Sequence, residues 1–265
     1  MGSNYQAAVG DMVQGFRNWR MWTRLAWSDV KGRYRRTVIG PFWATLSLGI
    51  VIFAMSVVMA RLFNADLRQF LPYLTAGMVT WALISSILNE STSVFTTGET
   101  LIKSLRFPLS TLVFALVWRN LIMFAHNLSI HAVATVLMSV PLSWTSLALF
   151  PGLLLIALNG LWVAVLLGIF GARFRDVPPV VTAVLQVVVF VTPIFWNADQ
   201  IKGKLGFVLT DLNVFYHFVQ IVRGPLLGTA PAYLSWLVVL GVSVFGWVVT
   251  LAMFSRFRRR IAYWL

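Results

Sequence analysis

The chain has 265 residues, of which 59% are hydrophobic and only 11% are charged, and its formal net charge is +13. A soluble domain carries roughly 25% charged residues, so these proportions exclude a soluble fold and predict that most of the chain faces lipid. The absence of cysteine excludes disulfides, thiolate chemistry and zinc–thiolate sites.

The first distinctive segment is RMWTRLAWSDVKGRYRR, residues 20–36, which mixes arginines with aromatic rings. When residues 16–35 are wound as a helix, the apolar side chains fall within one arc of about 140°, and five of the cations fall on a separate arc of about 60°. The pattern predicts an amphipathic helix over residues 14–36 that lies in the membrane interface, with its rings at headgroup depth. Two roles remain open: a simple anchor for the first span, or a collector of an anionic, lipid-linked substrate.

Apolar runs long enough to cross about 30 Å of hydrocarbon recur along the rest of the chain. The sequence therefore predicts an all-α integral membrane protein with a single transmembrane domain over 1–265. Segment 198–228 is too mixed for two further crossings and is predicted to form short re-entrant helices. The six expected spans cover about 37–60, 70–90, 119–140, 146–171, 177–197 and 230–254.

Six spans place both termini on one side, and the lysines and arginines assign that side to the cytoplasm. Fifteen of them lie on the side of the termini and five on the other, while Arg119 is counted with neither. The net charge is thus a topology signal, and a nucleic-acid partner is excluded by the spans. The fifteen are Arg17, Arg20, Arg24, Lys31, Arg33, Arg35, Arg36, Lys103, Arg106, Arg173, Arg175, Arg256, Arg258, Arg259 and Arg260; the five are Arg61, Arg68, Lys202, Lys204 and Arg223.

Catalytic motifs are sparse, and neither a catalytic residue nor a metal site is predicted. No Walker A motif is present, so ATP is not expected to bind through such a loop. His126 and His131 point about 140° apart on one predicted helix, which is poor geometry for a metal. They are expected to face other helices, and a membrane-bound transferase that uses one of them is kept as an alternative. Glu90 is predicted to form a structural ion pair with Arg119 at the same depth.

Four segments occur in order over nearly the whole chain: DVKGRYRRTVIGPFWATL, LIKSLRFP, FGARFRDVPPVVTAVLQVVVFVTPIFW and NVFYHFVQIVRGPLLG. Together they resemble the membrane subunit of type-2 ABC exporters, especially the branch that exports O-antigen, capsular polysaccharide and teichoic acid. Family members often have Asn-Pro where this chain has Asn213-Val214, so the shape of the outer gate is left open.

The resemblance implies a permease rather than an enzyme, located in the bacterial inner membrane. It further implies a homodimer that pairs with two copies of a separate ATP-binding subunit. That subunit would bind ATP and Mg, so no cofactor is expected in this chain. From its residues, the segment after the second span is either a rigid helix against which a motor subunit could push or an ordinary interfacial loop, and the resemblance favours coupling to the ATP-binding subunit. The coupling residues expected there are Leu101, Lys103, Arg106, Phe107 and Pro108.

The implied cargo is a polyprenyl-pyrophosphate-linked glycan that crosses between spans one and five. Arg33, Arg35 and Arg36 are expected to pair with its phosphates. A drug or another lipid is the alternative cargo for the same fold. Aromatic side chains that either line the path or form an ordinary interface belt are Phe42, Trp43, Phe53, Tyr73, Trp81, Phe190, Phe195 and Trp196.

Overall fold

The computed structural model describes residues 2–34, 42–62, 64–141, 143–198, 201 and 203–265. Helices are the only regular secondary structure in these residues, which confirms the predicted all-α fold. Within the described ranges, five helical segments are long and apolar enough to cross a membrane, and a sixth is added if the bent pair over residues 203–226 counts as one span. The five are α3 (Phe42–Leu62), α4 (Leu67–Ser91), α7 (Ser110–Met138), α8 (Leu149–Arg173) with the 3₁₀ helix η1 (Trp144–Ala148) before it, and α12 (Tyr233–Trp264).

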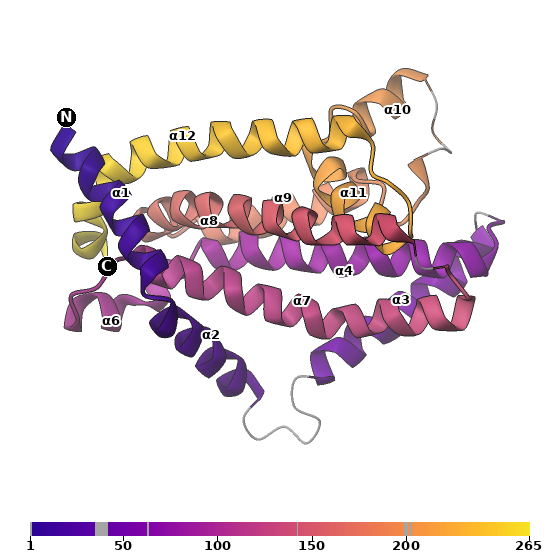
Figure 1. Cartoon of the computed structure of the whole chain (residues 1–265), viewed down its shortest axis with the longest axis horizontal. Coiled ribbons are helices and arrows are strands. Elements are labelled where there is room, and N and C mark those ends of the chain that lie inside the picture. Colours follow the sequence, from indigo (N-terminus) through magenta and orange to yellow (C-terminus); the bar gives the residue numbers. More distant parts are fainter. Residues whose placement is uncertain (1, 35–41, 63, 142, 199–200, 202) are drawn as a thin grey trace.

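The long helices run side by side as a bundle, and both chain termini lie at the same end of it, on the left in Figure 1. We call this the N/C end. Short helices gather at both ends of the bundle. The N/C end carries α1 (Gly2–Arg17), α2 (Trp19–Tyr34), α5 (Val94–Thr97) and α6 (Glu99–Ser104), and the opposite end carries α10 (Gly203–Leu209) and α11 (Val214–Leu226).

The amphipathic segment differs from the single helix expected over residues 14–36. Two helices of 16 residues each, α1 and α2, meet at Asn18. Asparagine is a weak helix former, and a change of direction here lets α1 contact α12 while α2 contacts α7. The helical part before residue 14 was not predicted from the sequence.

One edge of the apolar arc of α2 packs against protein rather than lipid. Ala26 and Val30 are buried, and Trp22 stacks on Phe114 of α7 with ring centroids 6.0 Å apart. Other rings of the predicted arc remain exposed. They are Phe16 at the end of α1, and Trp19 and Trp27 in α2.

The expected fifth span is shorter than predicted. Helix α9 (Val177–Val191) has 15 residues, or about 22 Å at 1.5 Å per residue. Thr192 precedes Pro193, and a residue in that position is disfavoured in the helical conformation. Thr192 accordingly adopts an extended backbone with φ −83° and ψ 135°, and α9 ends before it.

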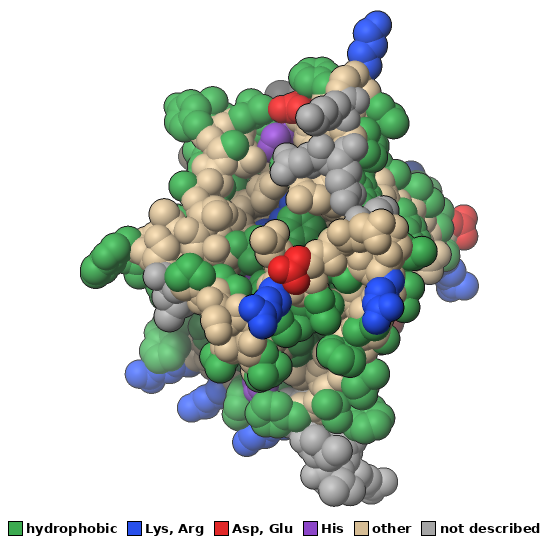
Figure 2. All heavy atoms as spheres, turned by 90° about the vertical axis from the view of Figure 1, so that its right-hand side faces the viewer, with side chains coloured by type: hydrophobic (Ala, Val, Ile, Leu, Met, Phe, Trp, Pro, Cys, Tyr) green, Lys and Arg blue, Asp and Glu red, His purple; other side chains and the backbone are tan. Residues whose placement is uncertain are grey.

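The segment before the last span contains the predicted short helices. The axes of α10 and α11 are bent by 76° relative to each other. Asn213 starts α11, because its side-chain Oδ1 accepts hydrogen bonds from the backbone N–H groups of Phe215 at 3.0 Å and Tyr216 at 3.3 Å. The asparagine therefore supplies the helix start even though valine, not proline, follows it. Figure 2 shows this end of the molecule, where charged side chains are scattered among hydrophobic ones.

A close backbone approach joins the end of α4 to α8. A Cβ atom added to Gly171 would lie 1.7 Å from the carbonyl oxygen of Thr92, and one added to Gly168 would lie 2.6 Å from the Val94 side chain. Glycine at these two positions lets the segment after α4 lie directly on α8. This contact fixes where the chain leaves α4 at the N/C end.

We expect Gly171→Ala to lower the free energy of unfolding by about 1–3 kcal/mol, because the new methyl group must push backbone away. Gly241→Ala in α12 is the matched control, since nothing lies within 4 Å of its added Cβ. It should be neutral or stabilise by up to about 1 kcal/mol. Equilibrium unfolding in mixed detergent–SDS micelles compares the two, and equal effects would contradict the close-contact argument.

Candidate functional site

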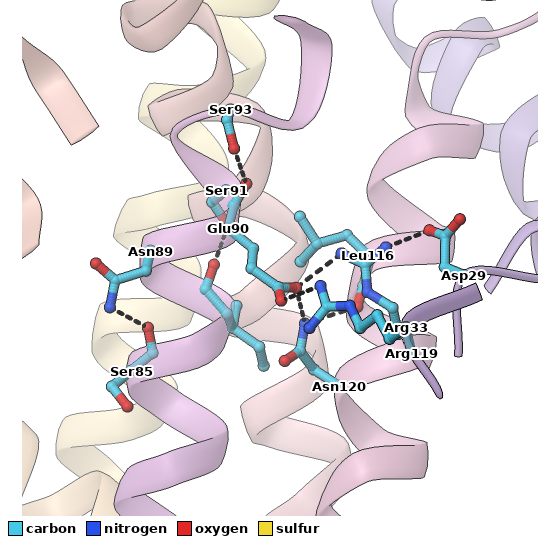
Figure 3. Close-up of polar contacts among 11 residues, drawn as sticks. Asp29, Arg33, Ser85, Asn89, Glu90, Ser91, Ser93, Leu116, Arg119 and Asn120 are labelled. Carbon is cyan, nitrogen blue, oxygen red and sulfur yellow. Dashed lines mark hydrogen bonds and ion pairs between the residues drawn. The ribbon is translucent and has the colours of Figure 1, made fainter. Parts of the chain in front are cut away.

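A network of ion pairs lies at the N/C end, between α2, α4 and α7 (Figure 3). Its centre is Glu90, near the end of α4. The Glu90 carboxylate accepts hydrogen bonds from Arg33 Nη2 at 2.5 Å, Arg119 Nη2 at 2.7 Å and Asn120 Nδ2 at 2.8 Å. The predicted pair of Glu90 and Arg119 is thus present, and Arg33 joins it from α2.

Arg119 also pairs with Asp29 of α2 through its Nη1 atom. The two arginines and two carboxylates alternate in the order Arg33, Glu90, Arg119, Asp29, and their charges sum to zero. Asp29 and Arg33 are one helical turn apart, so one face of α2 is fastened to both α4 and α7. The i, i+4 spacing of Asp29 and Arg33 is visible in the sequence and places both side chains on one face of α2, but their partners on α4 and α7 were not predicted from it.

A cleft of about 430 Å³ opens beside the network. Its lining combines the charged side chains with the hydroxyl groups of Ser93 and Thr97 and with apolar residues of α7. The Arg33 side chain is 48% exposed, whereas that of Arg119 is only 13% exposed. Arg33 is therefore the cation of the network that can exchange its carboxylate partner for an external anion, while Arg119 is held in place.

A second carboxylate, Asp11 of α1, is completely buried at the same end. Its Oδ1 accepts the backbone N–H of Ser110 at 3.0 Å, and its Oδ2 accepts that of Leu109 at 3.2 Å and Arg258 Nε at 2.7 Å. Asp11 thereby caps the first turn of α7 from another helix and holds the end of α12. No pattern along the sequence marks this residue, because its partners are about a hundred or more positions away.

The residues expected to contact an ATP-binding partner lie at the N/C end. Leu101 and Lys103 belong to α6, and the following extended segment carries Arg106, Phe107 and Pro108 into α7. Figure 1 shows α6 on the left of the view, beyond the start of α7. Arg106 and Lys103 are exposed, so this segment presents positive charge at the N/C end.

Of the three arginines expected to meet substrate phosphates, Arg33 is in the network. Arg35 and Arg36 lie outside the described residues.

The eight aromatic residues proposed for a path fall into two groups. Phe42, Trp43 and Phe53 of α3 and Phe190 of α9 are more than half exposed, so they present rings on the outer faces of these two helices. Phe195 and Trp196 are half-buried beside Phe190.

Tyr73 and Trp81 of α4 belong to the second group, because their contacts are internal. The Tyr73 hydroxyl donates to the carbonyl oxygens of Pro193 at 3.2 Å and Trp196 at 3.1 Å. Trp81 is buried edge-on against Phe215, with ring centroids 5.8 Å apart. In this structure both rings pack inside the bundle rather than on the faces of α3 and α9.

Arg223 of α11, counted from the sequence among the outer cations, is buried at 1% exposure. Its Nη1 donates to the Pro193 carbonyl at 2.6 Å, and its guanidinium lies 4.2 Å from the centroid of the Tyr73 ring. The cation is stabilised by a carbonyl dipole and an aromatic face. It fastens α11 to the chain just after α9.

The two histidines of α7 have separate surroundings. His131 lies between the Thr75 hydroxyl at 2.9 Å and the Leu226 carbonyl at 3.0 Å, so it faces α4 and α11 as expected. His126 contacts the Ile122 carbonyl of its own helix at 2.8 Å. Within the described ranges, no three His, Asp or Glu side chains gather in a way that would hold a metal ion.

Comparison with known proteins places this architecture in a class. Residues 21–227 match the protein-family model described as ABC-2 type transporter, so the chain belongs to that family of membrane transport proteins. Within it, the chain is similar to the O-antigen export system permease protein RfbA of Myxococcus xanthus, with 25% identity over 183 residues, covering 66% of this chain and 68% of the relative. It is also similar to the protein of the same name from Klebsiella pneumoniae, with 22% identity over 188 residues and coverage of 69% and 71%. The chain is therefore a multi-pass membrane protein of a transporter family.

Removing the central carboxylate of the network tests its structural part. Glu90→Gln leaves the shielded Arg119 with one carboxylate fewer, and we expect the free energy of unfolding to fall by about 1–3 kcal/mol. Glu99→Gln is the matched control, because Glu99 pairs with Lys103 at 2.6 Å in an exposed i, i+4 pair. Such pairs contribute only about 0.3–0.5 kcal/mol. Unfolding in mixed micelles that gave the two variants the same loss would show that the Glu90 network does not hold α2.

Proposed function

We propose that this chain is the permease subunit of an ATP-driven exporter that moves a lipid-linked polysaccharide of the O-antigen type across the bacterial inner membrane. The observation that carries the proposal is its similarity, over two thirds of its length, to two permeases of O-antigen export systems. The N/C end is the cytoplasmic end in this proposal, because it carries the larger share of lysines and arginines.

Energy comes from a separate ATP-binding subunit that docks at α6. The position of α6 beyond the start of α7 and the exposed Arg106 support this assignment, since a rigid helix ahead of α7 transmits a push directly to a spanning helix. A second copy of the chain is the proposed neighbour of α3 and α9. Their outward-facing rings, among them Phe53 and Phe190, would then lie at a dimer interface and offer faces on which sugar rings stack.

The cargo enters at the network around Glu90. A pyrophosphate carries more negative charge than one carboxylate and offers several acceptor oxygens to a guanidinium group. It therefore competes with Glu90 for the half-exposed Arg33, together with Arg35 and Arg36 of the adjoining segment. Because Arg33 is the contact of α2 with Glu90, binding of the headgroup loosens α2 from α4 at the moment when the cargo must pass.

Deleting the gene in its native host should leave long lipid-linked polysaccharide on the inner face of the membrane and a bare cell surface. Complementation with wild type restores export. Complementation with Arg33→Gln, Arg35→Gln and Arg36→Gln together should restore membrane insertion but give at least about tenfold less surface glycan, because charged hydrogen bonds to phosphate are lost. Fractionation and blotting of the glycan measure both.

The matched control is Arg61→Gln with Arg68→Gln at the opposite end, which removes two cations without touching the proposed entrance. If the triple variant exports as much glycan as this control, the three arginines do not recruit the cargo. Unchanged surface glycan in the deletion strain would overturn the cargo itself.

Reversal of one charge tests coupling to the ATP-binding subunit. We expect Arg106→Glu to weaken assembly of the complex or to lower transport per ATP hydrolysed several-fold, because a partner surface matched to a cation meets a like charge instead. Glycan export and ATP hydrolysis are measured together in reconstituted vesicles. Normal coupled turnover would reassign the segment as an ordinary interfacial loop.

A second candidate cargo is favoured by one observation. A groove of about 460 Å³ lies between α3, α4 and α7, and its lining is largely apolar, with Phe42 and Phe53 at its rim and Thr45 and Thr75 among its polar members. A lipid or an apolar drug fits such a lateral groove better than a glycan does. Intact surface polysaccharide in the deletion strain, with altered drug resistance or lipid distribution, would favour this candidate.

A further inference from the structure

The bend between the two interfacial helices borders a cleft that the proposed transport pathway does not use. This cleft has a volume of about 540 Å³. On one side it is lined by the end of α1 and the start of α2, and on the other by the segment between α6 and α7. Three arginines line it, Arg17 and Arg20 from the bend and Arg106 from the segment.

The three arginines have no carboxylate in the cleft. The acidic side chains on the elements that form or adjoin it are engaged elsewhere. Asp11 of α1 holds α7 and Arg258, Asp29 of α2 pairs with Arg119, and Glu99 of α6 pairs with Lys103. The cleft thus concentrates positive charge. No acidic side chain among the described residues neutralises it.

The surroundings of the arginines indicate where that anion comes from. Trp19 lines the cleft and is 57% exposed, and the neighbouring Phe16 is exposed as well. Exposed tryptophans of membrane proteins lie at headgroup depth. Met21 and Phe107 add apolar surface beside the cations. A phosphate with a hydrocarbon attached satisfies both parts of this lining, which an acidic protein side chain does not.

We propose that this cleft binds the phosphate headgroup of an anionic phospholipid of the cytoplasmic leaflet. It is distinct from the proposed cargo entrance. Arg20 and Arg33 lie near opposite ends of α2, about 20 Å apart along its axis at 1.5 Å per residue. The bound lipid joins the bend between α1 and α2 to the segment that connects α6 with α7. Anionic lipid therefore fixes the position of α6 relative to the membrane surface.

The full-length chain, purified in detergent, is titrated with dioleoylphosphatidylglycerol or with zwitterionic dioleoylphosphatidylethanolamine, and bound lipids are counted by native mass spectrometry. We expect one phosphatidylglycerol per chain, bound in clear preference to the zwitterionic lipid. Arg17→Gln and Arg20→Gln should each weaken that binding roughly fivefold, as expected for a cation at an anionic membrane surface. Arg20→Lys should keep the preference, because it keeps the charge.

Arg24→Gln is the matched control. Arg24 is exposed and belongs to the same helix, but it does not line the cleft. An equal loss in this variant would show diffuse attraction to lipid and overturn a discrete site, as would equal binding of the two lipids.

Two further measurements distinguish an anionic phospholipid from other anions that could occupy the cleft. A polyprenyl diphosphate that displaced phosphatidylglycerol, with a loss of affinity in Arg20→Gln, would assign the cleft to the cargo and refute the phospholipid. Loss of binding to the ATP-binding subunit in Arg17→Gln and Arg20→Gln, with unchanged lipid binding, would assign it to an acidic protein surface. The outcome is independent of the transported substrate, because no arm measures export.

Discussion

Two carboxylates, those of Asp11 and Glu90, hold the helices of the N/C end together. Asp11 has no exposed side-chain surface, and its oxygens are shared among two backbone N–H groups at the start of α7 and the guanidinium of Arg258 in α12. A buried charge without partners would cost several kcal/mol, so the contacts of Asp11 stabilise the meeting of α1, α7 and α12. Glu90, whose side chain is 23% exposed, joins α2, α4 and α7 in the same way. These polar contacts add to the apolar packing of α2 on α7.

These two carboxylates also divide the cations of the N/C end into different kinds. Arg258 pairs with Asp11 and Arg119 pairs with Glu90 inside the bundle, so both arginines stabilise the structure. Arg33 is paired but half exposed, which makes its partner exchangeable. Arg17 and Arg20 have no carboxylate partner in the part of the chain that the structure describes, and they line a separate cleft with Arg106. The sequence gives one uniform positive charge, but the acidic partners divide it into shielded pairs, a half-exposed pair and arginines that line a separate cleft.

The opposite end uses another way to hold a charge. Arg223 is buried and pairs with no carboxylate among the described residues; the Pro193 carbonyl, the Gln220 side chain and the face of Tyr73 surround it instead. This contact joins α11 to the turn that follows the short helix α9. Two of the rings assigned from the sequence to a path, Tyr73 and Trp81, are therefore engaged in holding this end. The rings of α3 and α9, by contrast, face outward from the chain.

The sequence by itself determined the helical membrane fold, the position of most long helices and the pairing of Glu90 with Arg119, because hydrophobic runs of lipid length and charges at equal depth are local or nearly local signals. It missed the part of α1 before residue 14, and it placed the end of α9 at residue 197 although the helix ends at Val191, ahead of Pro193. Tertiary structure alone decided the partners of Asp11 and Arg223 and how far each arginine of the N/C end is paired and exposed. Those partners come from segments far apart in the chain, and no spacing along a sequence specifies which distant groups a buried charge will meet.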